Sequence, residues 1–489
     1  MIDLRQGLNE GEIIMPGPVA PRIVLAGLGP YARAFYYPLL ERYHSAGRLT
    51  IDTVVELSSQ RELIDRYLAG RFIQPRRVVL VEEGLHCDAL TIALESDDAT
   101  HSAPPWGCIV ATEPRAHRTY VEWAARHGMH VLLEKPVTAR DLRSGGAAEA
   151  LRLVDDHRFL TDISEKYGVT VVVQTQRRAH PGYRMVKEIL TDVVTSYGVP
   201  ITYLDMYHSD GTWNMPWEFA AREGHPYKYG YGKLLHSGYH FLDLFCWLTE
   251  VNRDSCRPPD QLLMDVTAID ARAVDTQLTD PSYERLFGEE QWRRYDGLPR
   301  PASLPEQPWG ETDVVLLARS MNGGNVVTTA VLSLLQSALS SRAWLALPED
   351  TYKGNGRVRH ERMTIQVGPL LSVQVHSYQD GRSAGRGPFD VVVYRNHRLL
   401  GGEAVSRITL RSGDGPSTAE SDSLNNQARE EIFQDFLAAD GRRSGLALHD
   451  NTVRVLAAAM AGVIRSSQGG SGRSAVLLDA GGGDWYRPA

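Results

Sequence analysis

Hydrophobic and polar positions along the first third of the chain predict strands and helices in alternation. RIVLAGLGPYARAFYYPLLERY runs from a short aliphatic strand through a glycine-rich turn into a helical pattern, and LTIDTVVELSSQRELIDRYL repeats that order. Further strands are expected at CDALTIAL, WGCIVAT, HVLLEKP and residues 169–176, with an amphipathic helix in RAHRTYVEWAARHG. This alternation predicts a doubly wound parallel sheet over residues 21–176, preceded by a tail of residues 1–20.

The pattern changes beyond residue 176. Long apolar segments surround Asn322-Gly323-Gly324, a hairpin signal, and predict an α+β domain over residues 177–489 with a large, mainly antiparallel open sheet. Residues 253–310 hold many Pro, Asp and Glu residues and little periodicity, so loops are expected there as an insertion. Two closing helices are expected within residues 427–467.

Charge and hydropathy exclude several classes of function. The 489 residues include 52 basic and 60 acidic side chains, a net charge of −8, and no cluster of Lys and Arg that would bind nucleic acid. No apolar run reaches the roughly 18 residues of a membrane span, and the acidic N-terminus does not resemble a signal peptide. We therefore expect a cytoplasmic protein with neither nucleic acid nor a membrane as partner.

The turn after the first strand has the spacing of a dinucleotide-binding loop. The GxGxxG/A positions run from Gly27 through Gly29, Pro30 and Tyr31 to Ala32, where small residues permit a tight turn and close approach of a pyrophosphate. Glu56 ends the second strand, where a carboxylate accepts from a ribose 2′-hydroxyl and repels a 2′-phosphate. The first domain is thus predicted to be a Rossmann domain that binds NAD in preference to NADP.

The segment YGYGKLLHSGYHFLDLFCWL, residues 229–248, raises a second question. If it is helical, His236, His240 and Asp243 occupy positions i, i+4 and i+7 and share one polar face. Two imidazoles and a carboxylate could bind a metal ion. However, the segment lacks the glutamate of HExxH, and Gly238 weakens the helix, so we favour a substrate site without a metal.

Several motifs together resemble a known family. The segment CIVATEPRAHRTYVEWAARHGMHVLLEKPVT is similar to the Ala-Thr-x-Pro and Glu-Lys-Pro segments of the glucose–fructose oxidoreductase and inositol dehydrogenase family (Gfo/Idh/MocA). VVVQTQRRAHPGYRMVKEIL resembles the crossover into that family's second domain, and GKLLHSGYHFLDL resembles its active-site helix. The resemblance extends from Arg22 to about Leu248, and continues loosely to the closing helices.

This resemblance implies an NAD(P)-dependent oxidoreductase acting on a secondary alcohol or ketone. It implies that Lys135 positions the substrate hydroxyl and that His240 is the general acid/base, since such a reaction needs a proton carrier and a cation beside the developing alkoxide. His236 stands where the family usually has aspartate, so it is either a second proton carrier, a sign of a different substrate or the cause of a weakened redox step. Besides the glycine turn and Glu56, the implied cofactor contacts are Ala111, Thr112, Pro114, His117, Glu134, Lys135 and Gln176.

The expected substrate is a sugar, a sugar derivative or a cyclitol. The side chains expected to bind it, besides Lys135, His236 and His240, are Arg177, Tyr207 and Trp213; Arg177 and Arg178 could meet a carboxylate or a phosphate. An open antiparallel sheet suggests a homodimer or homotetramer. Two alternatives stay open: a sugar-modifying enzyme that retains NAD without net redox, and a dinucleotide-binding regulator with altered catalysis.

Overall fold

The structure is a computed structural model. It describes residues 20–95, 105–142, 145–222, 226–301, 309–346, 356–380, 387–411, 423–478 and 486–488. The predicted tail, apart from its last residue, lies outside these residues.

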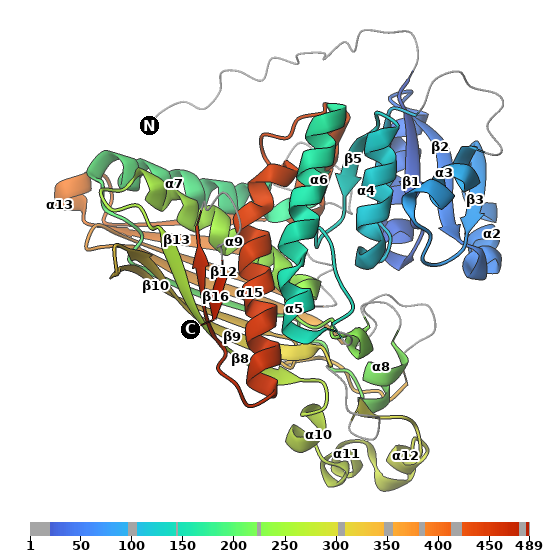
Figure 1. The fold of residues 1–489 in the computed structure, drawn as a ribbon. Coiled ribbons are helices and arrows are strands. Elements are labelled where there is room, and N and C mark those ends of the chain that lie inside the picture. The colour runs from blue at the N-terminus through green and yellow to red at the C-terminus, as the bar shows by residue number, and fades with distance from the viewer. Residues whose placement is uncertain are drawn as a thin grey trace.

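The N-terminal part forms a six-stranded parallel sheet (Figure 1). Its strand order is β3-β2-β1-β4-β5-β6, and the strands are β1 (Arg22–Ala26), β2 (Thr50–Leu57), β3 (Arg77–Val81), β4 (Gly107–Val110), β5 (His130–Leu133) and β6 (Val171–Val173). The helices of this part are α1 (Tyr37–Ser45), α2 (Arg61–Ala69), α3 (Cys87–Glu95), α4 (His117–Arg126), α5 (Gly146–Leu151) and α6 (Leu153–Tyr167). The central strands are aliphatic and almost fully buried, as expected of a parallel sheet covered on both faces.

One strand assignment from the sequence is wrong. CDALTIAL was expected to be a strand, but Cys87–Glu95 is helix α3 and the third strand is Arg77–Val81. A short apolar run of this length fits a buried strand and a buried helix equally well. The β-branched segment RVVLV, which follows two arginines, is the strand instead.

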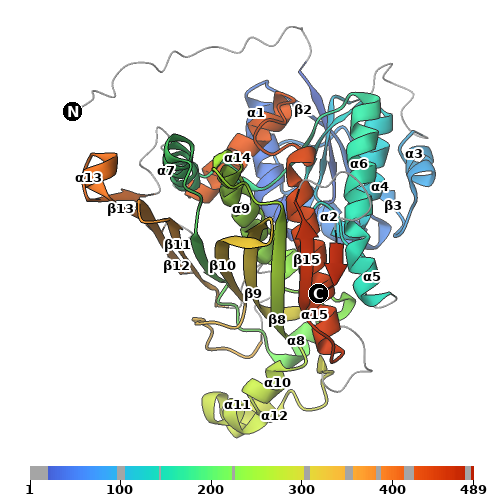
Figure 2. The same ribbon diagram turned by 60° about the vertical axis from the view of Figure 1, so that its left-hand side comes forward.

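The second part forms a ten-stranded sheet (Figure 2). The strand order is β14-β13-β12-β11-β7-β10-β9-β8-β15-β16, and β7 and β10 form its parallel pair. Its strands are β7 (Tyr203–Ser209), β8 (Gln261–Asp270), β9 (Glu311–Asn322), β10 (Asn325–Leu335), β11 (Val358–Val367), β12 (Leu371–Asp380), β13 (Phe389–Arg395), β14 (Val405–Leu410), β15 (Arg473–Leu477) and β16 (Tyr486–Pro488). The predicted hairpin is confirmed, because Gly323 and Gly324 alone separate β9 from β10, with φ of 53° and 84°.

Long helices cover one face of this sheet. They are α7 (Pro181–Tyr197), α9 (Tyr239–Thr249) and α15 (Asp450–Ser467), while α13 (His397–Leu400) lies at the sheet edge (Figures 1 and 2). The opposite face exposes apolar side chains such as Val315, Leu317 and Tyr378, each about 40% exposed. Such a face is compatible with the expected homo-oligomer, which stays a prediction.

Helix α14 (Leu424–Leu437) returns to the first domain. Its Phe433 and Phe436 belong to the same buried cluster as β1 and α1, and Phe436 contacts Trp106 with ring centroids 5.3 Å apart. The closing segment therefore completes the core of the Rossmann domain, while α15 packs on α5, α6 and β8.

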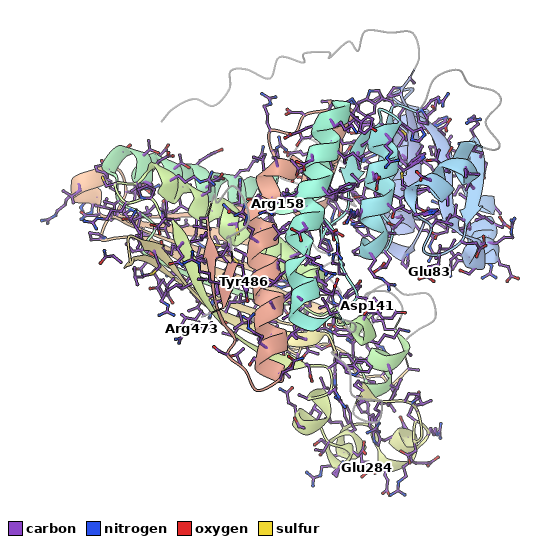
Figure 3. All side chains as sticks on the ribbon, viewed as in Figure 1. Glu83, Asp141, Arg158, Glu284, Arg473 and Tyr486 are labelled. Carbon is purple, nitrogen blue, oxygen red and sulfur yellow. The ribbon has the colours of Figure 1, made fainter. Side chains whose placement is uncertain are left out.

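The expectation of loops throughout residues 253–310 is wrong. Residues 261–270 form β8, which pairs with β9 and β15 inside the large sheet. The short helices α10 (Val274–Gln277), α11 (Asp280–Phe287) and α12 (Glu289–Arg293) follow it, and with α8 (Pro216–Ala221) they form a lobe below the sheet. Glu284 lies in this lobe, far from the first domain's β3 edge (Figure 3). Buried aromatic rings stabilise the lobe: Tyr283 stacks on Trp292 at 4.1 Å.

None of the helices in the described part of the chain is long and apolar enough to cross a membrane.

Candidate active site

The glycine-rich turn lies at the carboxyl end of β1. Gly27 has φ of 89°, and an added Cβ would lie 2.7 Å from the carbonyl carbon of Ala111, so both backbone and space require glycine there. Gly29 differs, because an added Cβ would meet no heavy atom within 4 Å. The protein itself does not require glycine at residue 29, which is the position where a pyrophosphate approaches the backbone in dinucleotide-binding turns.

Glu56 closes this turn. Its carboxylate accepts hydrogen bonds from the amides of Leu28 at 2.6 Å and Leu57 at 2.9 Å. The acid therefore lies against the glycine turn, as a ribose-binding carboxylate would require. Pro30 and Tyr31 begin the following helix, and Ala32 opens a π-helical segment, Ala32–Tyr36.

The ends of β4 and β5 are held together by His117. Its imidazole is fully buried, with Nδ1 3.0 Å from the carbonyl oxygen of Pro136 and Nε2 3.2 Å from that of Thr112. Burial lowers its pKa to about 4. His117 thus connects the two strand-end loops through their backbone. This geometry gives it a positioning role, and the direct cofactor contact implied for it is not supported.

The neighbouring residues of these loops extend along the same edge of the sheet. Ala111 continues the β4 strand and donates its amide to Ala26 at 2.8 Å, while Thr112 and Pro114 form the turn into α4. Glu134 accepts from the hydroxyl of Tyr36 at 2.6 Å. The first domain thereby brings the implied cofactor residues of β1, β2, β4 and β5 to the carboxyl ends of its strands, where open α/β sheets bind ligands.

Lys135 joins the two domains. It follows β5, and its ammonium donates to the carbonyl oxygen of His236 at 2.8 Å. Burial lowers its pKa, although the charges of Glu134 and Asp210 oppose that shift. An ammonium has three donors, so one hydrogen bond to the protein leaves donors for a substrate oxygen.

His236 and His240 are both present at the site, but not on one regular helix. His236 lies in a π-helical segment, Leu234–Gly238, with a non-helical ψ of −110°, and α9 begins at Tyr239. Nδ1 of His240 has no hydrogen-bond partner within the described residues, although only 8% of the residue is exposed. Burial, with the charge of Lys135 next in effect, holds the pKa of His240 well below 6.5. The imidazole is therefore neutral at pH 7 and able to accept a proton.

The prediction that His236, His240 and Asp243 share one face of a regular helix is wrong. Asp243 is fully buried, and its carboxylate pairs with the guanidinium of Arg178 at 2.6 and 3.0 Å. It also lies 3.1 Å from Nδ1 of His449 and accepts from Thr452. The kink at His236 breaks the register between His236 and α9, whereas His240 and Asp243 remain three residues apart on α9. Asp243 is part of a buried structural network.

Arg178 is thus not available to a substrate, whereas Arg177 points toward the site. Arg177 donates to Glu361 at 2.5 Å, and its guanidinium lies 4.1 Å from the ring centre of Phe241. Phe241 directly follows His240 in α9, and the charge of Arg177 lowers the pKa of His240. Gln176, also buried, precedes it in a short 3₁₀ turn.

Two expected substrate contacts lie elsewhere. Tyr207 is on the outer face of the large sheet, where its ring meets His360 and the guanidinium of Arg362, so its assignment to the substrate site is wrong. The period of two along β7 turns its neighbour His208 inward instead. Trp213 lines a cavity of about 380 Å³ beside the lobe, together with Thr212, Asn214, Phe219, Val274, Gln277, Leu278, Leu286, Gln336, Ser337, Ala338 and Ser340. Tyr227 connects the lining of that cavity with His236. Its hydroxyl hydrogen-bonds to Gln336, and the ring of Tyr227 packs edge-on against the ring of His236.

Sequence reasoning missed a charged group on the inner face of the large sheet. Lys233 donates to Asp210 at 2.6 Å and lies 3.1 Å from Nδ1 of His208. Arg357 also donates to Asp210, and Arg359 follows two residues later. Alternation in RVRHER places charged side chains on one strand face, but the sequence does not show which face is inward.

A metal centre finds no support in the described part of the chain, where no three His, Cys, Asp or Glu side chains are placed to bind one ion.

Comparisons with known proteins agree with this architecture. Residues 22–173 match a family described as an oxidoreductase family with an NAD-binding Rossmann fold, which confirms the resemblance noted in the sequence. A comparison with curated protein sequences found no match.

Solved structures match over almost the whole chain. KijD10, a 3-ketoreductase from Actinomadura kijaniata in complex with NADP and TDP-benzene, is 13% identical, with 90% of this chain and 96% of that chain covered at a TM-score of 0.52. The WlbA dehydrogenase from Bordetella pertussis, in complex with NADH and UDP-GlcNAcA, is 13% identical over 94% and 100% of the two chains at a TM-score of 0.52. The aldose–aldose oxidoreductase from Caulobacter crescentus is 15% identical over 94% and 100%, at a TM-score of 0.50. At these identities the similarity shows a shared two-domain fold.

Proposed function

We propose that this chain, whose residues 22–173 match an oxidoreductase family with an NAD-binding Rossmann fold, transfers hydride between a nicotinamide and a secondary alcohol or ketone of a sugar-like substrate. One observation carries the proposal. The ammonium of Lys135, from the first domain, hydrogen-bonds to the second domain at His236, and its charge acts on the buried imidazole of His240. A cation and a neutral base thereby meet at the carboxyl ends of the parallel strands.

The residues present fit a dinucleotide. Gly29 leaves open space at the turn, and the helix that follows offers amides to a pyrophosphate. Glu56 supports NAD in preference to NADP, since a carboxylate at the end of β2 repels a 2′-phosphate. The amides of Leu28 and Leu57 already hold this carboxylate in place.

The nicotinamide supplies the hydride acceptor or donor. Lys135 would donate a hydrogen bond from Nζ to the substrate oxygen and stabilise its alkoxide character. His240, neutral and without a protein partner on Nδ1 in the described residues, would accept the hydroxyl proton in the oxidative direction and return it in the reductive direction. The backbone carbonyl of His236 fixes the ammonium, so this residue acts on the site through its backbone as well as its ring.

The descriptions of similar solved structures support a sugar-like substrate. The relatives named above are described as a 3-ketoreductase, a dehydrogenase in complex with UDP-GlcNAcA and an aldose–aldose oxidoreductase.

The test combines binding and turnover. NADH and NADPH are titrated by protein fluorescence, and formation of NADH from NAD is followed at 340 nm with a panel of sugars and cyclitols. We expect NADH to bind more tightly than NADPH and Lys135→Ala to abolish turnover while leaving the Kd for NADH within about twofold. Lys166→Ala, an exposed lysine on α6, is the matched control. Absence of NADH binding to the wild type would refute the proposal, and tightly retained NAD without net consumption would favour a non-redox sugar modification instead.

A further inference from the structure

Positive charge exceeds negative charge in a buried group beside Lys135 and His240. Within the described residues, four cationic side chains of the second domain make their ion pairs with only two carboxylates. The cations are Arg177, Lys233, Arg357 and Arg359, and the carboxylates are Asp210 and Glu361.

Glu361 is shared unequally by two arginines. Arg177 reaches it at 2.5 Å, and Glu361 also accepts from the hydroxyl of Tyr183 at 2.8 Å. Nε of Arg359 stays 3.9 Å away, which is beyond hydrogen-bonding distance. Glu361 is therefore occupied by Arg177 and Tyr183, and Arg359 is left with a weak ion pair.

Asp210 is likewise occupied. Lys233 donates to it at 2.6 Å, and Arg357 and the hydroxyl of Ser237 also donate to it. Although burial opposes this, Lys233 and Arg357 hold the pKa of Asp210 well below its usual range. The carboxylate is fully ionised at neutral pH, and it still balances only one of its two cations.

The group adjoins the proposed reaction centre. Ser237, which contacts Asp210, directly follows the residue whose carbonyl accepts from Lys135. The charge of Arg357 lowers the pKa of Lys135, and that of Arg177 lowers the pKa of His240. The contacts of Arg357 and Ser237 with Asp210 thus connect the cationic group to the segment that holds Lys135 through the carbonyl of His236.

The protein leaves one donor of each of three arginines unpaired in the described residues. Nε of Arg177, Arg357 and Arg359 is buried and has no hydrogen-bond partner in the described residues. The side chains of Arg357 and Arg359 nevertheless remain 17% and 14% exposed. Burial, with Arg357 and Arg177 beside it, lowers the pKa of Arg359 to about 9. A buried cation with so little compensation weakens the fold unless a ligand supplies the missing charge.

We propose that Arg357 and Arg359 bind an anionic group of the substrate, a carboxylate or a phosphate, so that the enzyme acts on an acidic rather than a neutral sugar. This inference rests on the proposed function, because it assigns the substrate class of the same site. Arg357 directly precedes β11 and Arg359 is its second residue. Both alternate with Val358 and lie on the side that bears Glu361, with about 6–7 Å between their Cα atoms. Planar guanidiniums at this spacing suit bidentate recognition of carboxylate or phosphate oxygens.

The first experiment measures thermal unfolding of the full chain with D-glucuronate, D-galacturonate, D-gluconate, D-glucose 6-phosphate and the parent neutral hexoses. Each is tested with and without NADH, against sodium chloride of equal ionic strength. We expect at least one acid or phosphate to raise the midpoint above its neutral parent, and Arg359→Met to remove that difference. Arg362→Met is the matched control, since Arg362 lies on the outer face of the same strand and is 55% exposed. A response confined to carboxylates or to phosphates identifies which anion is bound.

The second experiment needs no substrate. If Arg359 serves a ligand, Arg359→Met should raise the unfolding midpoint of the ligand-free protein, because it removes a poorly paired buried cation. If Arg359 is a structural partner of Glu361, the midpoint should fall. A fall, an equal response to neutral and acidic sugars, or no response to any anion would overturn the inference. NADH binding is measured on the wild type and on Arg359→Met. Absence of NADH binding to the wild type would count against the proposed function. The comparison of acidic with neutral sugars in the absence of NADH would still decide the inference.

Discussion

A methyl group added at Gly29 separates cofactor binding from folding. The substituted Cβ meets no heavy atom of the protein within 4 Å, and its φ lies outside the left-handed region, so Gly29→Ala should fold as the wild type does. The same methyl would occupy the surface at which a pyrophosphate approaches the turn. We therefore expect unchanged stability with weakened NADH binding.

The size of both effects follows from local geometry. Loss of one charge-assisted hydrogen bond costs about 1.5–3 kcal/mol, which corresponds to a roughly 10- to 150-fold increase in the Kd for NADH. Gly27→Ala provides the contrast, because φ of 89° and a Cβ 2.7 Å from the backbone of Ala111 act on the folded protein itself. The left-handed conformation costs about 1–2 kcal/mol and the overpacking about 1–3 kcal/mol. Together these lower the melting midpoint of a domain of this size by at least about 4 °C.

The assay is fluorescence titration with NADH beside thermal unfolding without ligand, for the wild type and both variants. Gly29→Ala should change only the titration, and Gly27→Ala should change the unfolding midpoint as well. An unaltered Kd in Gly29→Ala, measured on protein with the wild-type midpoint, would show that the dinucleotide does not approach this turn.

Three further results are expected. His240→Ala should lower kcat by about 10²- to 10⁴-fold through loss of the proton carrier with an unchanged Kd for NADH, and retention of wild-type kcat would remove His240 from the mechanism. His236→Asp should raise the pKa of His240, because a carboxylate stabilises the imidazolium. The acid limb of the pH profile of oxidation should then move to higher pH. An acid limb that stays in place or moves to lower pH would contradict this. Asp243→Asn should cost about 3–5 kcal/mol of unfolding free energy at pH 7 by leaving Arg178 buried without its partner. The folded-state pKa of Asp243 is depressed. Its contribution to stability is therefore fully present above the unfolded-state pKa of about 3.9 and is lost progressively as the pH falls from there toward the folded-state pKa. Urea unfolding at pH 7 and pH 3 should show that the difference in unfolding free energy between wild type and variant becomes smaller at the lower pH.

The first domain was more predictable than the second. Its strands are buried on both faces, so their sequences are continuous aliphatic runs between turn signals, and only the short run at Cys87–Glu95 was ambiguous enough to mislead. The glycine turn and Glu56 could be located because their roles depend on neighbours close in the chain. The match of residues 22–173 to the oxidoreductase family confirms the motif-based identification.

Site residues of the second domain were harder to predict. Side chains alternate between the two faces of a strand, and the sequence does not show which of the two sets faces inward. Tyr207 and His208 are adjacent in the sequence, yet the ring of Tyr207 meets His360 on the outer face and His208 is fully buried beside Lys233. Arg357 and Arg359 come about 110 residues after the helix that carries His240, and the pairing of β11 with β7 places Arg357 beside Asp210. No local pattern contains that information.

The substitution of histidine at residue 236 also has a consequence for charge. The family resemblance implies an aspartate at this place, and such a carboxylate would stabilise the protonated form of the neighbouring histidine. Here Asp210 accepts from Ser237, the residue after His236, but Lys233 and Arg357 already neutralise it. Its charge acts on Lys135, and the surroundings of His240 remain cationic. A cationic site disfavours imidazolium while it stabilises an alkoxide or a bound anion. His240 is therefore suited to accept a proton from an alcohol whose own acidity the site increases, and the same positive field that lowers its pKa is the field that would select an acidic sugar.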